Sequence, residues 1–111
     1  MTPQLKQREN RKQTTMPEVY VKLLNKGMKY DEHNMFPFMT HENATVENLI
    51  EQLHEEHEDR FDVYLKDKDK RVLRRDAIVI VNGMNMVARN GLKTKLSKGD
   101  LIVFMIAAVG G

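Results

Sequence analysis

Residues 78–111 read IVIVNGMNMVARNGLKTKLSKGDLIVFMIAAVGG, and this stretch decides the fold. The continuous apolar run Ala77–Val81 ends at Asn82-Gly83, which predicts an interior strand closed by a turn. A second apolar run, Leu101–Ile106, predicts a final strand. That strand leads almost directly into Gly110-Gly111, so its position determines where the tail begins.

Upstream of this stretch, the spacing of apolar residues predicts one amphipathic helix. Thr45 can cap the first turn, because a threonine hydroxyl accepts from the exposed backbone N–H groups there. The following side chains recur at i, i+3, i+4 and i+7, the period of one helical face: Val46, Leu49, Ile50, Leu53 and His57. Mostly glutamates occupy the other positions, so we expect this helix to cover one face of a sheet.

Two further strands are predicted before the helix. Residues 18–25 are rich in β-branched and aromatic residues, and Val19, Val21 and Leu23 alternate onto one face. Met35–Met39 contains Pro37, which places that strand at a sheet edge or bulge. We expect the two to form an antiparallel hairpin across a loop at 26–34. Short apolar runs at 61–65 and 72–73 predict additional strands.

The order strand, strand, helix, strands predicts an α+β, β-grasp domain. It would have a mixed sheet of four to five strands packed on one main helix, with the first and last strands parallel at the centre. We expect the domain to span residues 18–111. Residues 1–17 are polar and show no period, which predicts a flexible N-terminal extension.

Composition and charge limit the function classes. The 111 residues include no cysteine, which excludes disulfides, thiolate metal sites and a cysteine nucleophile. Residues 1–17 carry four basic side chains and one glutamate, whereas the remainder is close to neutral, which disfavours nucleic-acid binding by the folded part. The basic residues of 66–75 alternate with aspartates and predict a solvated loop, with an RNA- or partner-binding patch as the alternative.

No segment has the length and hydropathy of a membrane span or the pattern of a signal peptide. A cytoplasmic protein that does not contact membranes is therefore expected.

The terminal Gly110-Gly111 pair has two interpretations. Glycine lacks a Cβ, so such a tail could enter a narrow active site and present its carboxylate there. The alternative is a frayed chain end. The tail alone does not decide between them.

The block described above resembles the C-terminal half of the MoaD/ThiS sulfur carriers and their ubiquitin-like relatives. The matching motifs are Val81-Asn82-Gly83, Asn90-Gly91-Leu92, Lys98-Gly99-Asp100 and the strand that leads to the terminal Gly-Gly. The resemblance extends, less specifically, over residues 18–111. Molybdopterin-type members typically have a Pro-Pro pair where this chain has Ile106-Ala107, which leaves other sulfur-transfer or modifier roles open.

The resemblance implies chemistry at the Gly111 carboxylate, with Gly110 beside it. A ubiquitin-activating-type partner would use ATP and Mg²⁺ to adenylate that carboxylate, and a sulfur donor protein would then convert it to a thiocarboxylate. The acceptor would be an enzyme such as the molybdopterin synthase large subunit or a tRNA thiolase. Alternatively, lysines of target proteins would attack and form isopeptide bonds. The chain would be a carrier that binds no cofactor itself, not an enzyme.

The last strand and the residues after it are the candidate partner-binding segment: Phe104, Met105, Ile106, Ala107, Ala108 and Val109. Leu101, Val103 and Met105 alternate with a second apolar set, so one set should face the helix and the other a partner. The sequence does not decide which set faces outward.

Rival sites have less support. His54 and His57 are three residues apart, which differs from the four-residue spacing of the metalloprotease helix. We therefore expect a solvated acidic helix end there and predict no metal site. A function of another class remains open, an RNA-binding β-grasp module in which residues 66–75 and the N-terminal extension would act.

Overall fold

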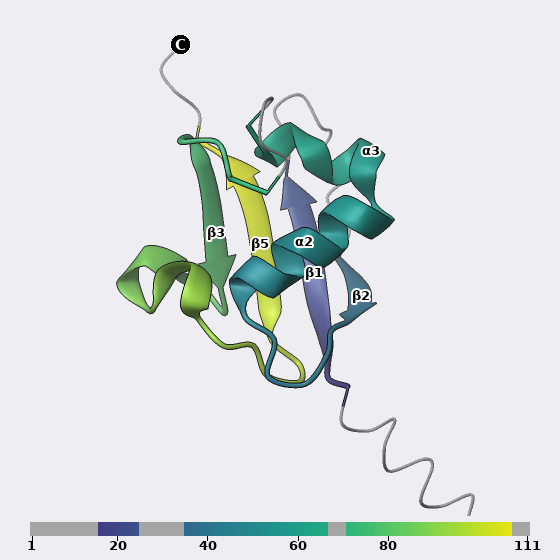
Figure 1. The fold of residues 1–111 in the computed structure, drawn as a ribbon. Helices are drawn as coiled ribbons and strands as arrows, with labels where there is room; N and C mark the ends of the chain where they lie inside the picture. The colour runs from purple at the N-terminus through teal and green to yellow at the C-terminus, as the bar shows by residue number, and fades with distance from the viewer. Residues whose placement is uncertain (1–15, 25–34, 67–70, 108–111) are drawn as a thin grey trace, which may run out of the picture.

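The computed structural model describes residues 16–24, 35–66 and 71–107. Its elements are, in chain order, β1 (Glu18–Leu24), β2 (Met35–Met39), α2 (Val46–Glu56), α3 (Glu58–Phe61), η2 (Asp62–Tyr64), β3 (Ala77–Val81), β4 (Met84–Asn85), η3 (Met86–Ala88), η4 (Gly91–Lys93) and β5 (Leu101–Ile106). Figure 1 shows α2 crossing one face of the sheet. Of the predicted extension, residues 1–15 lie outside the described residues, as do the predicted loop and the tail after Ala107.

Five strands form one mixed sheet in the order β2-β1-β5-β3-β4. Strands β1 and β5 run parallel, with Tyr20 opposite Leu101 and Leu24 opposite Met105. The other strand pairs, β1 with β2, β3 with β5 and β3 with β4, are antiparallel. The predicted β-grasp arrangement, with the first and last strands at the centre, is confirmed.

Helix α2 begins where the sequence predicts. The Thr45 hydroxyl accepts from the Asn48 backbone N–H at 3.3 Å, and the Asn48 side-chain oxygen accepts from the Thr45 N–H at 3.0 Å. This reciprocal pair satisfies two backbone donors that a helix start leaves unpaired. The helix buries Val46, Leu49, Ile50 and Leu53 of the predicted stripe against the sheet, whereas His57 is its C-cap and is only partly buried.

The turn after β3 is fixed by hydrogen bonds to the start of β5. Asn82 has φ of +51° and Gly83 has φ of +85°, in the left-handed region that asparagine and glycine tolerate best. The Asn82 side chain donates to Asp100 Oδ1 and accepts from the Leu101 N–H, both at 2.9 Å. These bonds hold the beginning of the last strand beside the end of β3.

The predicted strands at 61–65 and 72–73 are wrong. The chain forms α3 and η2 instead, and only a single bridge joins Leu65 to Leu73. Phe61 and Tyr64 are both fully buried. Residues three apart share a face in a helix but point to opposite faces in a strand, so helical geometry buries both aromatic rings together.

The core lies between α2 and the sheet. Three aromatic rings close one end of it: the Phe104 ring centroid lies 5.0 Å from that of Phe61 and 5.8 Å from that of Tyr64. None of the helices in the described segments is long and apolar enough to cross a membrane.

Candidate functional site: the outer sheet face and the end of β5

The alternation of β5 places Leu101, Val103 and Met105 on the face of the sheet opposite α2. Ile102 and Phe104 are fully buried, whereas the three outward residues are partly exposed. This observation decides which set of apolar residues is available to a partner.

Neighbouring strands add apolar side chains to the same face. Val103 lies opposite Ile80, and Met105 lies opposite Ile78 on one side and Leu24 on the other. We call this surface the outer apolar face and define it by six residues: Leu24, Ile78, Ile80, Leu101, Val103 and Met105. No member is fully buried and α2 covers the opposite face, so the outer apolar face is a candidate interaction surface (Figure 1).

Three of these residues were not among the sequence candidates. Ile78 and Ile80 belong to β3, where every residue is apolar and the sequence alone gives no sign of which side chains face outward. Leu24 joins the face through the parallel pairing of β1 with β5.

Phe104 was expected to contact a partner, and the structure corrects this. Its side chain is 0 % exposed and packs against Phe61 and Tyr64 in the core. Ile106 also packs against the core, although it is only partly buried. Of the remaining candidates, Met105 lies on the outer apolar face, whereas Ala108, Val109, Gly110 and Gly111 lie outside the described residues.

The end of β5 is held in place by the segment before β3. The Ala107 N–H donates to the Asp76 backbone oxygen at 2.8 Å. The Asp76 carboxylate accepts two hydrogen bonds of 2.9 Å from the Arg74 guanidinium, which also donates to the Val63 carbonyl at 3.3 Å. Bidentate pairing of this kind fixes the orientation of both side chains. The position of Asp76 in turn holds the backbone of Ala107 in place at the end of β5.

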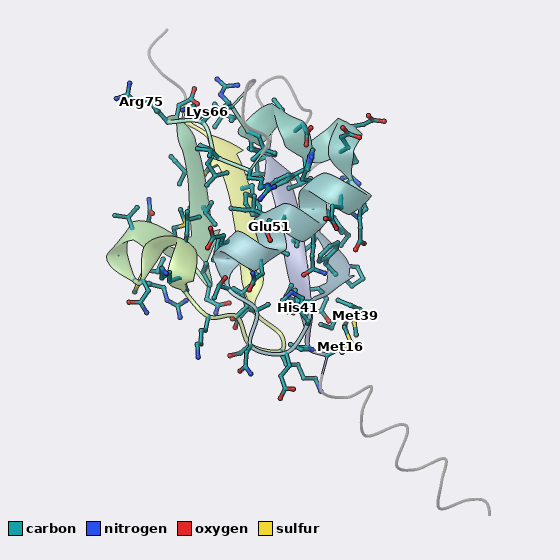
Figure 2. All side chains as sticks on the ribbon, viewed as in Figure 1. Met16, Met39, His41, Glu51, Lys66 and Arg75 are labelled. Carbon is teal, nitrogen blue, oxygen red and sulfur yellow. The ribbon has the colours of Figure 1, made fainter. Side chains whose placement is uncertain are left out.

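Two exposed basic side chains, Lys66 and Arg75, lie at the end of the molecule where β5 ends (Figure 2). Arg71 is also exposed and lines a hollow with Glu51, His54 and Glu55. Arg74 is instead committed to Asp76. The basic run was expected to be a solvated loop, and its described members other than Arg74 are exposed.

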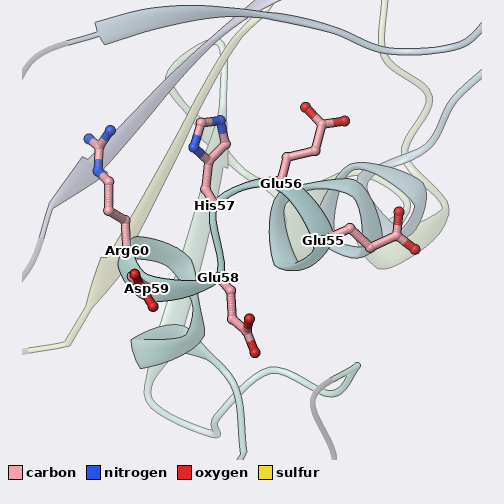
Figure 3. A pocket seen from close by; sticks show the side chains of 6 residues that line it. All are labelled: Glu55, Glu56, His57, Glu58, Asp59 and Arg60. Carbon is pink, nitrogen blue, oxygen red and sulfur yellow. The ribbon is translucent and has the colours of Figure 1, made fainter.

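The two histidines near the end of α2 were expected on a solvated helix end. Instead, His54 contacts Asp62, with 2.7 Å between Nδ1 and Oδ1. His57 packs its ring 5.2 Å from the Phe36 ring and 5.8 Å from the Phe38 ring. Residues 55–60 line a hollow of about 400 Å³. Figure 3 shows the His57 side chain pointing away from that of Glu58.

Comparison with known families identifies this architecture. The sequence pattern of the ThiS family matches residues 21–111. The chain belongs to the ThiS family. ThiS-family members are carrier proteins, which act as substrates of other enzymes and bind no cofactor of their own. The chain is therefore a carrier protein of the ThiS family.

Solved structures share the fold. The small archaeal modifier protein 1 (SAMP1) of Methanosarcina acetivorans matches with a TM-score of 0.68 and 23% identity, over 86% of this chain and 98% of that one. SAMP1 of Haloferax volcanii matches with a TM-score of 0.66 and 18% identity, over 85% and 99% of the two chains.

A chain in the Amycolatopsis orientalis BexX/CysO complex has a TM-score of 0.59 and 21% identity, over 84% of this chain and 99% of that one. No curated protein matches the sequence.

Proposed function

We propose that this ThiS-family chain carries sulfur as a thiocarboxylate on Gly111. The observation that carries the proposal is the family match, which runs to the last residue of the chain. The central position of β5 supports it, because the strand that precedes the tail is paired on both sides.

The proposed reaction takes place in partner enzymes. A Gly111 carboxylate oxygen attacks the α-phosphorus of ATP and pyrophosphate leaves, which gives an acyl-adenylate and requires Mg²⁺ in the activating enzyme. A persulfide on a donor protein then attacks the acyl carbon and AMP leaves, which gives an acyl disulfide. A thiol of the donor protein cleaves that S–S bond, which releases the thiocarboxylate and leaves a disulfide on the donor. The chain supplies the carboxylate and a rigid frame behind it, which lowers the entropic cost of placing the terminus in an active site.

We further propose that the outer apolar face docks on the activating enzyme. Val103, Met105 and their β3 neighbours lie on the strands that hold the end of β5, so a partner seated there would receive the tail. Of the sequence candidates, Leu101, Val103 and Met105 belong to this surface.

A second candidate is conjugation to lysines of other proteins. The fold match to two structures named small archaeal modifier protein favours it. The two functions share the adenylate and differ only in the nucleophile that attacks it, sulfur in one case and a lysine amine in the other.

Mass spectrometry of the protein from its native cells separates these functions. A gain of about 16 Da, sulfur in place of oxygen, is expected for the carrier, whereas Gly-Gly remnants on target lysines are expected for the modifier. Deleting Gly111 should abolish both products while the fold is retained. Retention of activation in that variant would refute the proposed role of the terminus, and salt-dependent RNA binding by it would favour the RNA-binding alternative.

The docking surface has its own test. Ile80→Glu places a charge in the outer apolar face, and we expect it to reduce ATP–pyrophosphate exchange by the activating enzyme at least tenfold. Val87→Glu is the matched control, because Val87 is 77% exposed in η3 and lies outside the outer apolar face. Equal exchange with both variants would contradict docking at this face.

A further inference from the structure

A histidine and two carboxylates meet where α2 passes into α3. His54 Nδ1 lies 2.7 Å from Asp62 Oδ1. A Glu58 carboxylate oxygen completes a set of three ligand atoms that all lie within 4.8 Å of one another. His54 and Asp62 are partly buried and Glu58 is exposed, so the cluster is open to solvent on one side.

A bend at His57 creates this cluster. In a continuous α-helix, residues eight positions apart are separated by about 12 Å along the axis, so His54 and Asp62 could not touch. His57 has φ of −134° and ψ of 43°, which ends α2 and turns the chain back before α3 (Figure 1). Its ring packs against Phe36 and Phe38, which fixes the bend. The two ligand atoms are therefore held together by packing on the opposite side of the chain.

The three donors match the coordination chemistry of a transition metal. Zinc binds imidazole nitrogen and carboxylate oxygen at about 2.0–2.2 Å, which places ligand atoms of a tetrahedral site about 3.3 Å apart. The His54–Asp62 pair is already close to that spacing, and the exposed Glu58 side chain can adjust to it. An imidazole nitrogen favours zinc and its neighbours over magnesium or calcium, which prefer oxygen ligands alone.

The surrounding charges also favour a cation. Glu51 and Glu55 line a hollow of about 260 Å³ together with His54 and Arg71. Among the described residues, two carboxylates and one guanidinium therefore line this hollow. Arg60 lies over the Phe36 ring, 5.2 Å from its centroid.

We propose that His54, Glu58 and Asp62 form a binding site for a divalent transition metal, with Zn²⁺ as the expected ion. Binding replaces the His54–Asp62 hydrogen bond with two metal–ligand bonds, and the neutral imidazole then carries its proton on Nε2. The ion would tie α3 to α2 and stabilise the bend. The site lies apart from the tail and does not depend on the sulfur-carrier function.

Titration of the untagged protein with Zn²⁺ tests this proposal. Calorimetry should show one ion bound per chain, Co²⁺ should give visible absorption bands of a bound complex, and Zn²⁺ should raise the midpoint of thermal unfolding. Removing a ligand should weaken Zn²⁺ binding at least tenfold, as loss of even an outer supporting group does in known sites. His54→Gln and Glu58→Gln are the test variants, and His41→Gln, at an exposed histidine outside the cluster, is the control.

Glu58→Gln keeps the experiment decisive if His54→Gln fails to fold, because Glu58 is exposed and lies outside the His54–Asp62 hydrogen bond. Undiminished Zn²⁺ binding in both cluster variants would overturn the proposal. Absence of saturable binding in the parent protein would also overturn it and leave the pair as a hydrogen bond only.

Discussion

Phe104 and Met105 are adjacent in β5, yet truncating them should have opposite consequences. Phe104→Ala removes a fully buried ring, and such truncations cost about 3–5 kcal/mol. We expect the upper part of that range, because the ring also loses its contacts with Phe61 and Tyr64, each worth about 0.5–1.5 kcal/mol beyond area burial. Met105→Ala truncates a partly exposed side chain and should cost about 0.5–1 kcal/mol.

Urea unfolding followed by circular dichroism measures both free energies of unfolding. A domain of this size has a total stability of about 5–15 kcal/mol, so Phe104→Ala brings it close to the unfolding threshold. Phe104→Leu is the control that keeps most of the buried volume and should recover much of the loss. Binding to the activating enzyme should follow the reverse pattern, weakened by Met105→Ala and retained by Phe104→Leu. The assigned orientation of β5 would be refuted if Phe104→Ala lowered the free energy of unfolding by less than about 1.5 kcal/mol. It would also be refuted if Met105→Ala lowered it by as much as Phe104→Ala does.

Three further predictions concern stability. Asn82→Ala should lower the free energy of unfolding by about 2–3 kcal/mol, because alanine at a positive φ is strained and the bonds to Asp100 and Leu101 are lost; Asn82→Gly loses the same bonds without the strain and should cost less in the same urea assay. Burial raises the pKa of Tyr64 above its usual 10.0, so the unfolded chain ionises first and stability should fall as pH rises above about 10, by up to about 1.4 kcal/mol per pH unit. Urea unfolding at several pH values between 8 and 11 measures this loss of stability. If the stability of Tyr64→Phe fell equally steeply with pH, the loss would come from other groups. Thr45→Ala should cost about 1 kcal/mol through loss of the helix cap, and Thr45→Ser should retain most of the stability; equal values for the two would argue against the cap.

The sequence predicted the elements whose periodicity is strong. Alternation identified β1, and the i, i+3, i+4, i+7 stripe with its Thr45 cap identified α2. The segment at 61–65 was misread because a short apolar run fits a strand and a buried helical turn equally well. Only the packing of Phe61 and Tyr64 against Phe104 decides between them.

Two features of the candidate sites have no local sequence signal. Both alternating sets of β5 are apolar, so the face that remains open depends on where α2 packs. The contact between His54 and Asp62 depends on the bend at His57, which in turn depends on Phe36 and Phe38 from a distant strand. Both features are tertiary, and local propensity cannot predict them.

The parallel pairing of β1 with β5 also determines how the domain resists force. Glu18 begins β1 at one end of the sheet, and Ile106 ends β5 at the other. A pull between these points loads the β1–β5 ladder along the strands, so its hydrogen bonds must fail together in shear and cannot open one at a time. Because β5 is also paired with β3, traction on its end is shared by two ladders. When a bound partner pulls away from the end of β5, we therefore expect the contact between partner and strand to break before the hydrogen bonds of the sheet do.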